Sequence, residues 1–381
     1  MFNPSELLRY SRHLLLPEFN LAGQQKLKQG SILVIGAGGL GSPALYYLAA
    51  AGVGRIGIAD FDTVDESNLQ RQILYQTQDV GKPKTEIAAL RLKQLNPYIE
   101  VITHFGPINS QNALGLIENY DVVIDGSDNL PTRYLVNDAC IFLGKPLVYG
   151  AIFQFEGQVS VFNQLHADGT RGPNYRDLFP EPPPPELVPS CSESGVLGVL
   201  PGIIGSLQAN EAIKLLSGIG ETLSGRLLLF DSLYFTTQMV TLKPNPQNPV
   251  SGANPTIRQL IDYEAFCNPA HHKPPPMEEI SAKDLKALLQ GSDKVLLLDV
   301  REPFEVEIAS LGGMNIPLNE ITERVNAIPR DIPVVVYCKS GQRSANAIKW
   351  LTQQHGFSNL KNLKGGILQW IQDVDAQLQK Y

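Results

Sequence analysis

A glycine-rich turn directly after an apolar stretch constrains the fold of this chain more than any other feature. The apolar run Ile32–Ile35 has the composition of a buried strand, and Ser42–Ala51 behind the turn has that of a helix. A strand, a glycine turn and a helix in this order are typical of a unit that holds a nucleotide phosphate. Glycines let the backbone approach phosphate oxygens, and the helix N-terminus offers free amides and a partial positive charge. The glycines of the turn are Gly36, Gly38, Gly39 and Gly41.

Strand-like and helix-like segments alternate after this turn. The alternation predicts an α/β fold with a mostly parallel sheet and helices on both faces. Ile152–Phe162 and Arg226–Leu242 are each expected to be a longer, antiparallel strand, so the predicted sheet is mixed. One short amphipathic helix is expected over Leu7–Leu16. The other strands are expected at Gly54–Ala59, Ile99–Thr103, Val122–Asp125 and Pro146–Val148, and the other helices at Lys82–Asn96, Tyr134–Phe142 and Ile203–Leu216.

Length and changes of composition predict more than one domain. A chain of 381 residues can form two or three domains of ordinary size. Residues 1–245 are expected to form the first domain, and the Pro- and Asn-rich residues 246–276 a linker. A second α/β pattern over 277–381, with strands at Val295–Asp299 and Val334–Tyr337, predicts a smaller domain.

Charge and cysteine content argue against several classes of partner and location. The formal net charge is −7, which disfavours nucleic acid or anionic lipid as the main partner. No apolar run reaches the roughly 18 residues of a membrane span, and no secretory signal begins at Met1. The four cysteines are widely spaced, which favours a reducing cytoplasm over a disulfide framework.

Charged residues beyond the glycine turn favour chemistry on phosphates. Asp60 ends the next expected strand, where a carboxylate can bind ribose hydroxyls. Arg71 and Lys84 follow, and Asp128 comes just after a later strand. Arg and Lys neutralise phosphate oxygens and an Asp can hold Mg²⁺, whereas hydride transfer has no evident need for this set. An NAD- or FAD-binding oxidoreductase with a redox cysteine remains an alternative.

Four motifs of the first domain resemble one known family. GAGGLGS, ADFDTVDESNLQRQ, GKPK and DGSDNLPTRYLVNDAC are similar to those of the MoeB/ThiF/HesA family, which is related to ubiquitin-activating enzymes. The resemblance implies a Rossmann-like domain that uses ATP to adenylate the C-terminal glycine of a small ubiquitin-like sulfur-carrier protein ending in Gly-Gly. It implies that Asp128 binds Mg²⁺–ATP, that Asp60 holds the ribose, and that Asn68, Arg71 and Lys84 contact the phosphates. Arg12 resembles an arginine that reaches the other subunit's ATP, so a homodimer is also implied.

Cys191 lies on a loop whose prolines, Pro180–Pro185, exclude helix and central strand. A thiolate on such a loop could attack an activated acyl group. The residue matches a family cysteine that in several members forms a thioester or acyl persulfide with the carrier. Many members also bind structural Zn²⁺ through two Cys-x-x-Cys pairs, whose matching positions here are Asn174–Asp177 and Asn248–Ser251. Because the thiolates are missing, no structural zinc is predicted.

The loop Cys338–Ser344 follows the strand Val334–Tyr337 and precedes a helix. Loop amides and the helix dipole would stabilise a thiolate or persulfide at Cys338, and Lys339 and Arg343 add positive charge. Arg343 is alternatively expected to lock the loop through a carboxylate such as Asp299 or Glu302. The residues from about 277 to 381 resemble a rhodanese domain, in which such a cysteine accepts sulfane sulfur.

The whole chain resembles fused adenylyltransferase–sulfurtransferases of the MoeZ type. The resemblance implies that ATP adenylates the carrier, that Cys338 takes sulfur from a cysteine desulfurase or thiosulfate, and that this sulfur displaces AMP to leave a thiocarboxylate. Molybdopterin synthesis is the favoured destination, and thiamine, cysteine or tRNA thiolation are alternatives. A further alternative is a protein without catalytic activity that only docks carriers.

Overall fold

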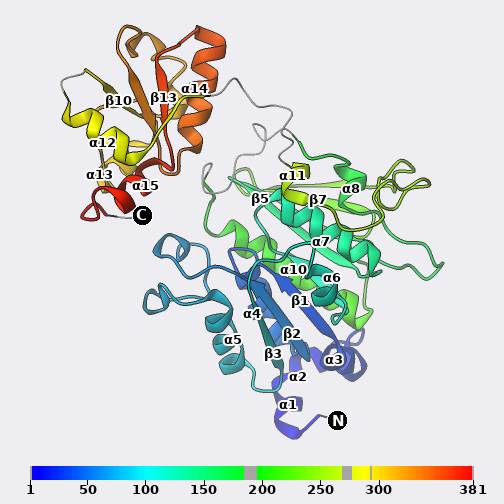
Figure 1. Ribbon diagram of the computed structural model, residues 1–381. Helices are drawn as coiled ribbons and strands as arrows, with labels where there is room; N and C mark the ends of the chain where they lie inside the picture. Colours follow the sequence, from blue (N-terminus) through cyan, green and yellow to red (C-terminus); the bar gives the residue numbers. More distant parts are fainter. Residues whose placement is uncertain (1, 184–194, 268–276, 292–293, 380–381) are drawn as a thin grey trace. The chain divides into compact units, whose positions relative to one another are not determined.

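The computed structural model describes residues 2–183, 195–267, 277–291 and 294–379. They belong to two compact units, Met1–Pro269 and Ala270–Tyr381 (Figure 1). Cys191 lies outside the described residues. In the part of the chain that is described, no helix has the length and apolar character needed to cross a membrane.

An eight-stranded mixed sheet forms the centre of the first unit, in the order β3-β2-β1-β4-β5-β6-β7-β8. The pairs from β3 to β5 are parallel, and those from β5 to β8 are antiparallel. The first three strands are added toward one edge of the sheet and β4 and β5 toward the other, so the strand order reverses between β1 and β4. Such a reversal of strand order opens a crevice at the carboxyl ends of the strands. The strands are β1 (Ser31–Ile35), β2 (Arg55–Asp60), β3 (Glu100–Phe105), β4 (Val122–Asp125), β5 (Leu147–Phe153), β6 (Glu156–Phe162), β7 (Arg226–Asp231) and β8 (Thr236–Thr241).

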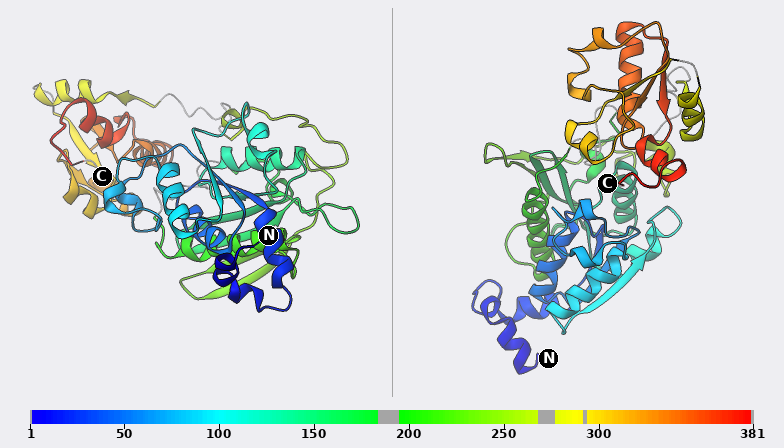
Figure 2. Two further views of the ribbon diagram at one scale, coloured as in Figure 1. Left: turned by 90° about the horizontal axis from the view of Figure 1, so that it is seen from below. Right: turned by 90° about the vertical axis from the view of Figure 1, so that its left-hand side faces the viewer.

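Helices cover both faces of this sheet, as the alternating pattern predicts, and two separate apolar cores result. One face packs against α3 (Asn20–Gln29), α4 (Gly41–Ala51), α5 (Lys84–Leu95) and α10 (Leu200–Ser217). The other face packs against α6 (Ala113–Ile117), α7 (Leu130–Phe142) and α11 (Tyr263–Cys267). The right-hand view of Figure 2 shows α10 and α7 on opposite sides of the sheet. The predicted mixed α/β fold is therefore confirmed.

Both segments expected to be long single strands contain a reversal of the chain. In the first, β5 runs on to Phe153, Gln154 takes a positive φ of 52°, and β6 returns from Glu156. In the second, β7 and β8 form a hairpin whose turn includes Phe235 with a φ of 53°. The prediction of single strands was wrong because neither turn contains the glycine that usually marks such a conformation.

The N-terminal segment is also divided, into α1 (Pro4–Arg9) and α2 (Ser11–Leu14) instead of one helix. Tyr10 separates them and is buried, and its hydroxyl accepts a 2.8 Å hydrogen bond from Asn96 Nδ2. The segment therefore forms two short helices with the buried Tyr10 between them, and not one continuous amphipathic helix.

The described part of the expected linker packs on the first unit. Asn248 and Val250 are buried, and Tyr263 and Cys267 join the core beneath α7. Tyr263 donates a 2.8 Å hydrogen bond to Asp138 Oδ2. The first unit therefore extends beyond residue 245, because Val250, Tyr263 and Cys267 of this Pro- and Asn-rich segment are buried against it.

The four positions that match the family's zinc cysteines lie together in a hydrogen-bonded cluster. The Nδ2 atom of Asn248 donates to Asp177 Oδ1 (2.7 Å) and to Asn174 Oδ1 (3.1 Å). Asn174 Nδ2 donates to Ser251 Oγ (2.8 Å). Asn248 Oδ1 accepts from the backbone N–H groups of Val250 and Ser251. Directional hydrogen bonds therefore join the segment around 248–251 to α8 (Tyr175–Leu178).

Next to this cluster, a buried ion pair joins α8 to α7. Arg176 donates to both carboxylate oxygens of Asp138 at 2.8 Å, and both side chains are fully buried. Its guanidinium lies 4.8 Å from the ring centroids of both Tyr134 and Phe266. Bidentate geometry and the extra hydrogen bond from Tyr263 offset the cost of burying these charges.

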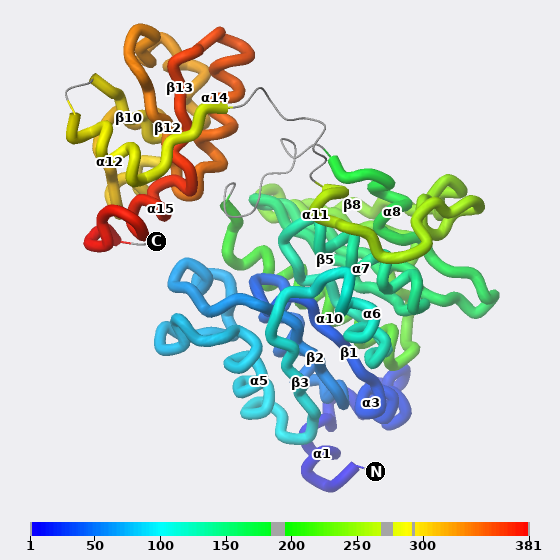
Figure 3. Tube along the Cα trace, in the orientation of Figure 1, coloured from blue at the N-terminus to red at the C-terminus, as the bar shows by residue number. Residues whose placement is uncertain are grey.

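A five-stranded parallel sheet forms the centre of the second unit, in the order β11-β10-β12-β13-β9. Figure 3 traces the chain through this unit, with β10, β12 and β13 labelled. Helix α14 packs in one of its two cores, and α12 and α15 pack in the other. The strands are β9 (Glu279–Ile280), β10 (Leu296–Asp299), β11 (Met314–Asn315), β12 (Val334–Tyr337) and β13 (Leu360–Leu363). The helices are α12 (Ala282–Gln290), α13 (Pro303–Ile308), α14 (Gln342–His355) and α15 (Gly366–Asp373).

Replacing Asn248 by Ala is expected to lower the free energy of unfolding of the first unit by about 1–3 kcal/mol, because buried donors and acceptors lose their partners. Far-UV circular dichroism in urea measures the change. Both tryptophans, Trp350 and Trp370, lie in the second unit, so the tryptophan fluorescence transition should not move. The exposed neighbour Gln247→Ala is the matched control.

EDTA is expected to leave the urea unfolding transition of the first unit unchanged. A transition that depends on the chelator would contradict the hydrogen-bonded cluster as the source of stability.

Candidate active sites

A cavity of about 670 Å³ lies at the carboxyl ends of β1, β2 and β4 in the first unit. These strand ends come from distant parts of the sequence, and the reversal of the sheet order brings them to one crevice. Seven of the predicted site residues line this cavity: Gly36, Gly38, Gly39, Asp60, Arg71, Lys84 and Asp128.

The glycines of the turn differ in how much room the structure leaves for a side chain. Gly36 has a φ of 88°, and a Cβ there would lie 2.7 Å from the carbonyl oxygen of Gly126. A Cβ on Gly41 would lie 1.9 Å from the Gly36 carbonyl oxygen, so this glycine lets α4 start against the turn. Gly38 has a usual φ and open space, since its nearest neighbour would be Gln72 Nε2 at 3.6 Å. Gly36 and Gly41 therefore allow the turn, and Gly38 leaves the cavity open.

The Asp60 carboxylate is held in place by backbone donors. Its Oδ2 accepts from Ala37 N (2.7 Å) and its Oδ1 from Asp62 N (2.8 Å). Burial raises the pKa of Asp60, while these donors and Lys84 oppose the rise. A fixed carboxylate at the end of β2 is suited to accept hydrogen bonds from a pair of hydroxyls.

The two cations of the cavity that the sequence predicts, Lys84 and Arg71, are oriented by neighbouring oxygens. Lys84 is buried, and its Nζ lies 2.8 Å from Asp62 Oδ2. Arg71 donates from Nη1 to the Ser67 carbonyl oxygen at 2.9 Å. Asn68 does not line the cavity, and its Oδ1 accepts from Asp65 N at 3.3 Å within the same loop. The predicted phosphate contact of Asn68 stays a prediction.

Asp125 ends β4 and Asp128 lies three residues further along the chain, and the two carboxylates have different surroundings. Asp125 is buried, and its Oδ1 accepts from both N (2.9 Å) and Oγ (2.6 Å) of Ser127. Burial raises the pKa of Asp125, which the nearby Arg133 and Ser127 oppose. Asp128 is exposed in the cavity wall, just before the start of α7. Asp125 thus holds the turn, and Asp128 is the carboxylate available to a ligand.

The cysteine loop of the second unit surrounds a buried sulfur. Cys338 is 1% exposed, and its Sγ accepts a 3.1 Å hydrogen bond from Gly341 N. Gly341 has a φ of 95° and begins α14. The Cys338 carbonyl oxygen accepts from Ile367 N at the start of α15 (2.9 Å). The loop is therefore fixed at both its sulfur and its backbone.

The carboxylate that binds Arg343 is Glu305, so the expectation of Asp299 or Glu302 was wrong. The two terminal nitrogens of Arg343 lie 2.6 and 2.7 Å from the two Glu305 oxygens. Asp299 is instead bound by the fully buried Arg301, whose Nε donates to it at 2.8 Å. Glu305 lies on α13 and reaches the loop only in the folded unit, which no local spacing reveals.

Comparison with known proteins identifies both units. The ThiF family matches residues 10–250, and the rhodanese-like domain matches residues 281–373. The chain belongs to the ThiF family. The resemblance inferred from its motifs is thereby confirmed for both units.

Relatives that match nearly the whole chain carry the same two units. A probable adenylyltransferase/sulfurtransferase MoeZ of Mycobacterium tuberculosis is 45% identical and covers 99% of this chain and 95% of its own. The adenylyltransferase and sulfurtransferase MOCS3 of Aedes aegypti is 42% identical over 100% of this chain and 90% of its own. A sulfur carrier protein adenylyltransferase of Thermus thermophilus is 55% identical over 69% of this chain and 97% of its own.

Among solved structures, Escherichia coli MccB with ATP aligns with a TM-score of 0.55 at 25% identity. The alignment covers 66% of this chain and 75% of MccB. This extent is close to that of the ThiF unit, and the likeness supports its Rossmann-like fold.

Arg133 is a cavity residue of the ThiF unit that the sequence analysis missed. It lines the cavity from α7, donates to the Ser127 carbonyl oxygen (3.2 Å), and lies 5.6 Å from the ring centroid of Tyr149. Within the described residues its buried Nε has no hydrogen-bond partner. Its position in the first turns of a helix that starts at the crevice was the available signal.

Arg12 lies away from the cavity of its own ThiF unit. It is exposed on α2, next to α1, and Arg9 of α1 donates to Leu95 O at the C-terminal end of α5. Lys84, at the other end of α5, lines the cavity. The 12 residues of α5 span about 18 Å, so the two regions lie near opposite ends of this helix.

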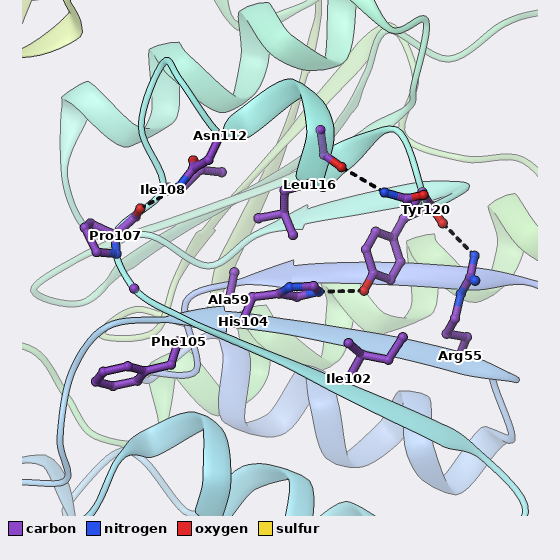
Figure 4. A pocket seen from close by; sticks show the side chains of 13 residues that line it. Arg55, Ala59, Ile102, His104, Phe105, Pro107, Ile108, Asn112, Leu116 and Tyr120 are labelled. Atoms are coloured by element: carbon purple, nitrogen blue, oxygen red, sulfur yellow. Dashed lines mark hydrogen bonds between the residues drawn. The ribbon is translucent and has the colours of Figure 1, made fainter.

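A second cavity, of about 500 Å³, lies beside the first at the β3 edge of the ThiF unit (Figure 4). His104 and Tyr120 meet in it with a 2.9 Å hydrogen bond, and burial lowers the pKa of His104. Ala59 and the segment 106–108 line both cavities. None of the predicted site residues lines this second cavity.

The other described cysteines differ from Cys338. Cys140 is fully buried in the core, and burial raises its pKa. Cys267 also lies in the core, where burial raises its pKa to about 12. Neither thiol lines the cavity of the ThiF unit.

Replacing Gly36 by Ala is expected to destabilise the ThiF unit by several kcal/mol, since the side chain adds backbone strain and a carbonyl clash. Replacing Gly38 by Ala is expected to change stability by less than about 0.5 kcal/mol, because the methyl group enters open space. Urea denaturation followed by circular dichroism measures both variants. Equal destabilisation would show that the two glycines do not have separate roles.

Proposed function

We propose that the chain adenylates the C-terminal glycine of a small sulfur-carrier protein with ATP and then transfers sulfur to it from Cys338. The observation that supports this most is the cavity that gathers the glycine turn with Asp60, Arg71, Lys84 and Asp128. Relatives with both units are named adenylyltransferase and sulfurtransferase, and MccB was solved with ATP.

In the first step, a carboxylate oxygen of the carrier attacks the α-phosphorus of ATP. A new P–O bond forms, the bond to the bridging oxygen breaks, and pyrophosphate leaves with the electron pair. Lys84 and Arg71 neutralise the developing charge on the phosphate oxygens, and Asp60 orients the ribose. The glycine turn supplies backbone N–H groups where the phosphates lie.

The residues present fit a magnesium ion. Mg²⁺ is usually held by one or two carboxylates together with substrate phosphates, and Asp128 is an exposed carboxylate in the cavity wall. When bound, the ion would neutralise charge on the phosphates. Asp125 is not its ligand in this proposal, because that carboxylate is buried and bound to Ser127.

In the second step, the Cys338 thiolate attacks the sulfane sulfur of a donor, such as thiosulfate or a cysteine desulfurase persulfide. An S–S bond forms, and sulfite or the desulfurase thiolate leaves. The terminal sulfur then attacks the acyl carbon, and AMP leaves with the electron pair of the broken C–O bond. A second thiol releases the thiocarboxylate by attacking Cys338, and the resulting disulfide is reduced by a cellular dithiol. Cys191, outside the described residues, is our proposed second thiol.

We further propose that the protein acts as a homodimer in the cytoplasm, in molybdopterin synthesis. Arg12 supports the dimer, because its own α5 separates it from the cavity of its subunit. The cytoplasm suits a thiol that must stay reduced to accept sulfur. Thiamine, cysteine and tRNA thiolation remain alternative destinations that use the same two chemical steps.

Asp128→Ala tests the function. It is expected to lower carrier-dependent ATP–pyrophosphate exchange at least about 100-fold, because a group that stabilises the transition state is lost. Sulfur transfer from thiosulfate to Cys338 should be unchanged, and Cys338→Ser should give the reverse pattern. The exposed Glu118→Ala is the control for Asp128.

Three outcomes would overturn the proposal. Exchange that is absent from the unaltered protein with every Gly-Gly-ended carrier would favour the carrier-docking protein without catalysis. Binding of NAD or FAD in place of ATP would favour the oxidoreductase. Loss of both activities in Asp128→Ala would contradict two independent sites.

A further inference from the structure

A buried chain of hydrogen bonds lies behind the sulfur of Cys338. Ser344 Oγ lies 3.4 Å from Cys338 Sγ and 2.7 Å from Asn362 Oδ1. Ser344 is fully buried and Asn362 is 3% exposed. The register of the sheet places Asn362 on β13 opposite Val336 of β12, the strand that leads into Cys338.

The carboxamide of Asn362 has one orientation that satisfies its neighbours. Its Nδ2 donates to the Gly341 carbonyl oxygen at 3.2 Å, which leaves Oδ1 facing Ser344. The reversed amide would place two acceptors, Oδ1 and the Gly341 oxygen, against each other. Gly341 O also accepts from Ala345 N at 3.2 Å, so both of its lone pairs are already used.

The Ser344 hydroxyl carries a single hydrogen, and three acceptors surround it. Asn362 Oδ1 is at 2.7 Å, Gly341 O at 3.1 Å and Cys338 Sγ at 3.4 Å. The shortest contact takes the hydrogen, because Asn362 Oδ1 accepts from no other donor within the described residues. The oxygen lone pairs of Ser344 therefore face the sulfur, where they suit a protonated thiol and not a thiolate.

We propose that Asn362 is a positioning residue of the sulfur site, which competes with the Cys338 sulfur for the hydrogen of Ser344. While Asn362 holds that hydrogen, the Ser344 hydroxyl does not donate to the Cys338 sulfur, which accepts from Gly341 N at 3.1 Å. When the sulfur becomes anionic, the hydroxyl must turn from Asn362 to donate to it. The inference rests on the sulfur-transfer function proposed above and adds a residue that acts through Ser344.

The pH dependence of Cys338 alkylation tests this competition in the full chain. Iodoacetamide modification is followed by mass spectrometry of the peptide that contains Cys338, so the other cysteines do not interfere. Asn362→Ala is expected to lower the apparent pKa of Cys338 by about one unit, since the hydroxyl is released to donate to the thiolate. A lower pKa also weakens the nucleophile, so the rate at pH 7 should rise about threefold and not tenfold.

A double-mutant cycle with Ser344→Ala separates positioning from general destabilisation. In the Ser344→Ala background, Asn362→Ala should leave the apparent pKa of Cys338 unchanged, because no hydroxyl remains to be released. Asn359→Ala is the matched control. Asn359 Nδ2 also donates to two backbone carbonyl groups, Pro329 O at 2.9 Å and Ile332 O, and neither acceptor belongs to the cysteine loop. It is expected to lower the melting temperature without moving the pH profile.

Asn362→Leu provides a second variant of similar volume if Asn362→Ala does not fold, with the same expected direction. An unchanged pH profile in a folded Asn362 variant overturns the proposal, as does an equal shift with and without Ser344. Failure of the proposed function has a different signature, in which the unaltered protein gains no sulfur mass on Cys338 from thiosulfate. The alkylation profile would still report on Asn362 in that case.

Discussion

Both candidate sites depend on the same backbone constraint, a glycine with positive φ between a buried parallel strand and a helix. Gly36 has a φ of 88° after β1, and Gly341 has a φ of 95° after β12. In each case a Cβ would approach another backbone turn, that of Gly126 at 2.7 Å and that of Gly365 at 3.2 Å. Such a close turn aims the first amides of the helix at the sheet edge, where an anion can bind. The rest of each site is arranged around that point.

The ThiF unit supports its cavity through the short helix α8, which is held from both sides. Arg176 ties it to Asp138 of α7, and Asp177, the next residue, ties it to Asn248. The chain leaving α8 contributes Phe179 to the cavity wall, so these bonds hold that wall in place. On the second side, the side chains of Asn174, Asp177, Asn248 and Ser251 hydrogen-bond to one another, which gives the buried amides partners and fixes their geometry.

Local patterns in the sequence were sufficient for the parallel strands of the ThiF unit, the glycine turn and the cysteine loop, because each depends on neighbouring residues. The reversals at Gln154 and Phe235 were missed, since non-glycine residues take the positive φ there. Glu305 could not be assigned to Arg343 for a related reason, as 38 residues separate the pair along the chain. Arg133 was missed for the same reason, because the packing of α7 on the sheet brings its side chain to the cavity wall. Sequence therefore predicts which residues have the chemistry, and packing decides which of them meet.

The two sites differ in where the negative charge arises and in how the protein stabilises it. In the ThiF unit the charge belongs to a substrate that arrives with several phosphates, so the cavity is open and holds fixed cations and an exposed Asp128. In the rhodanese-like unit the charge forms on the protein itself, at a sulfur that is 1% exposed. An open cationic cavity there would leave the thiolate exposed to oxidation, whereas a buried loop with a movable hydroxyl provides a donor only when the charge forms. Once it turns from Asn362 to the sulfur, the Ser344 hydrogen adds to the buried site a donor toward the negative charge, as Lys84 and Arg71 do in the open site.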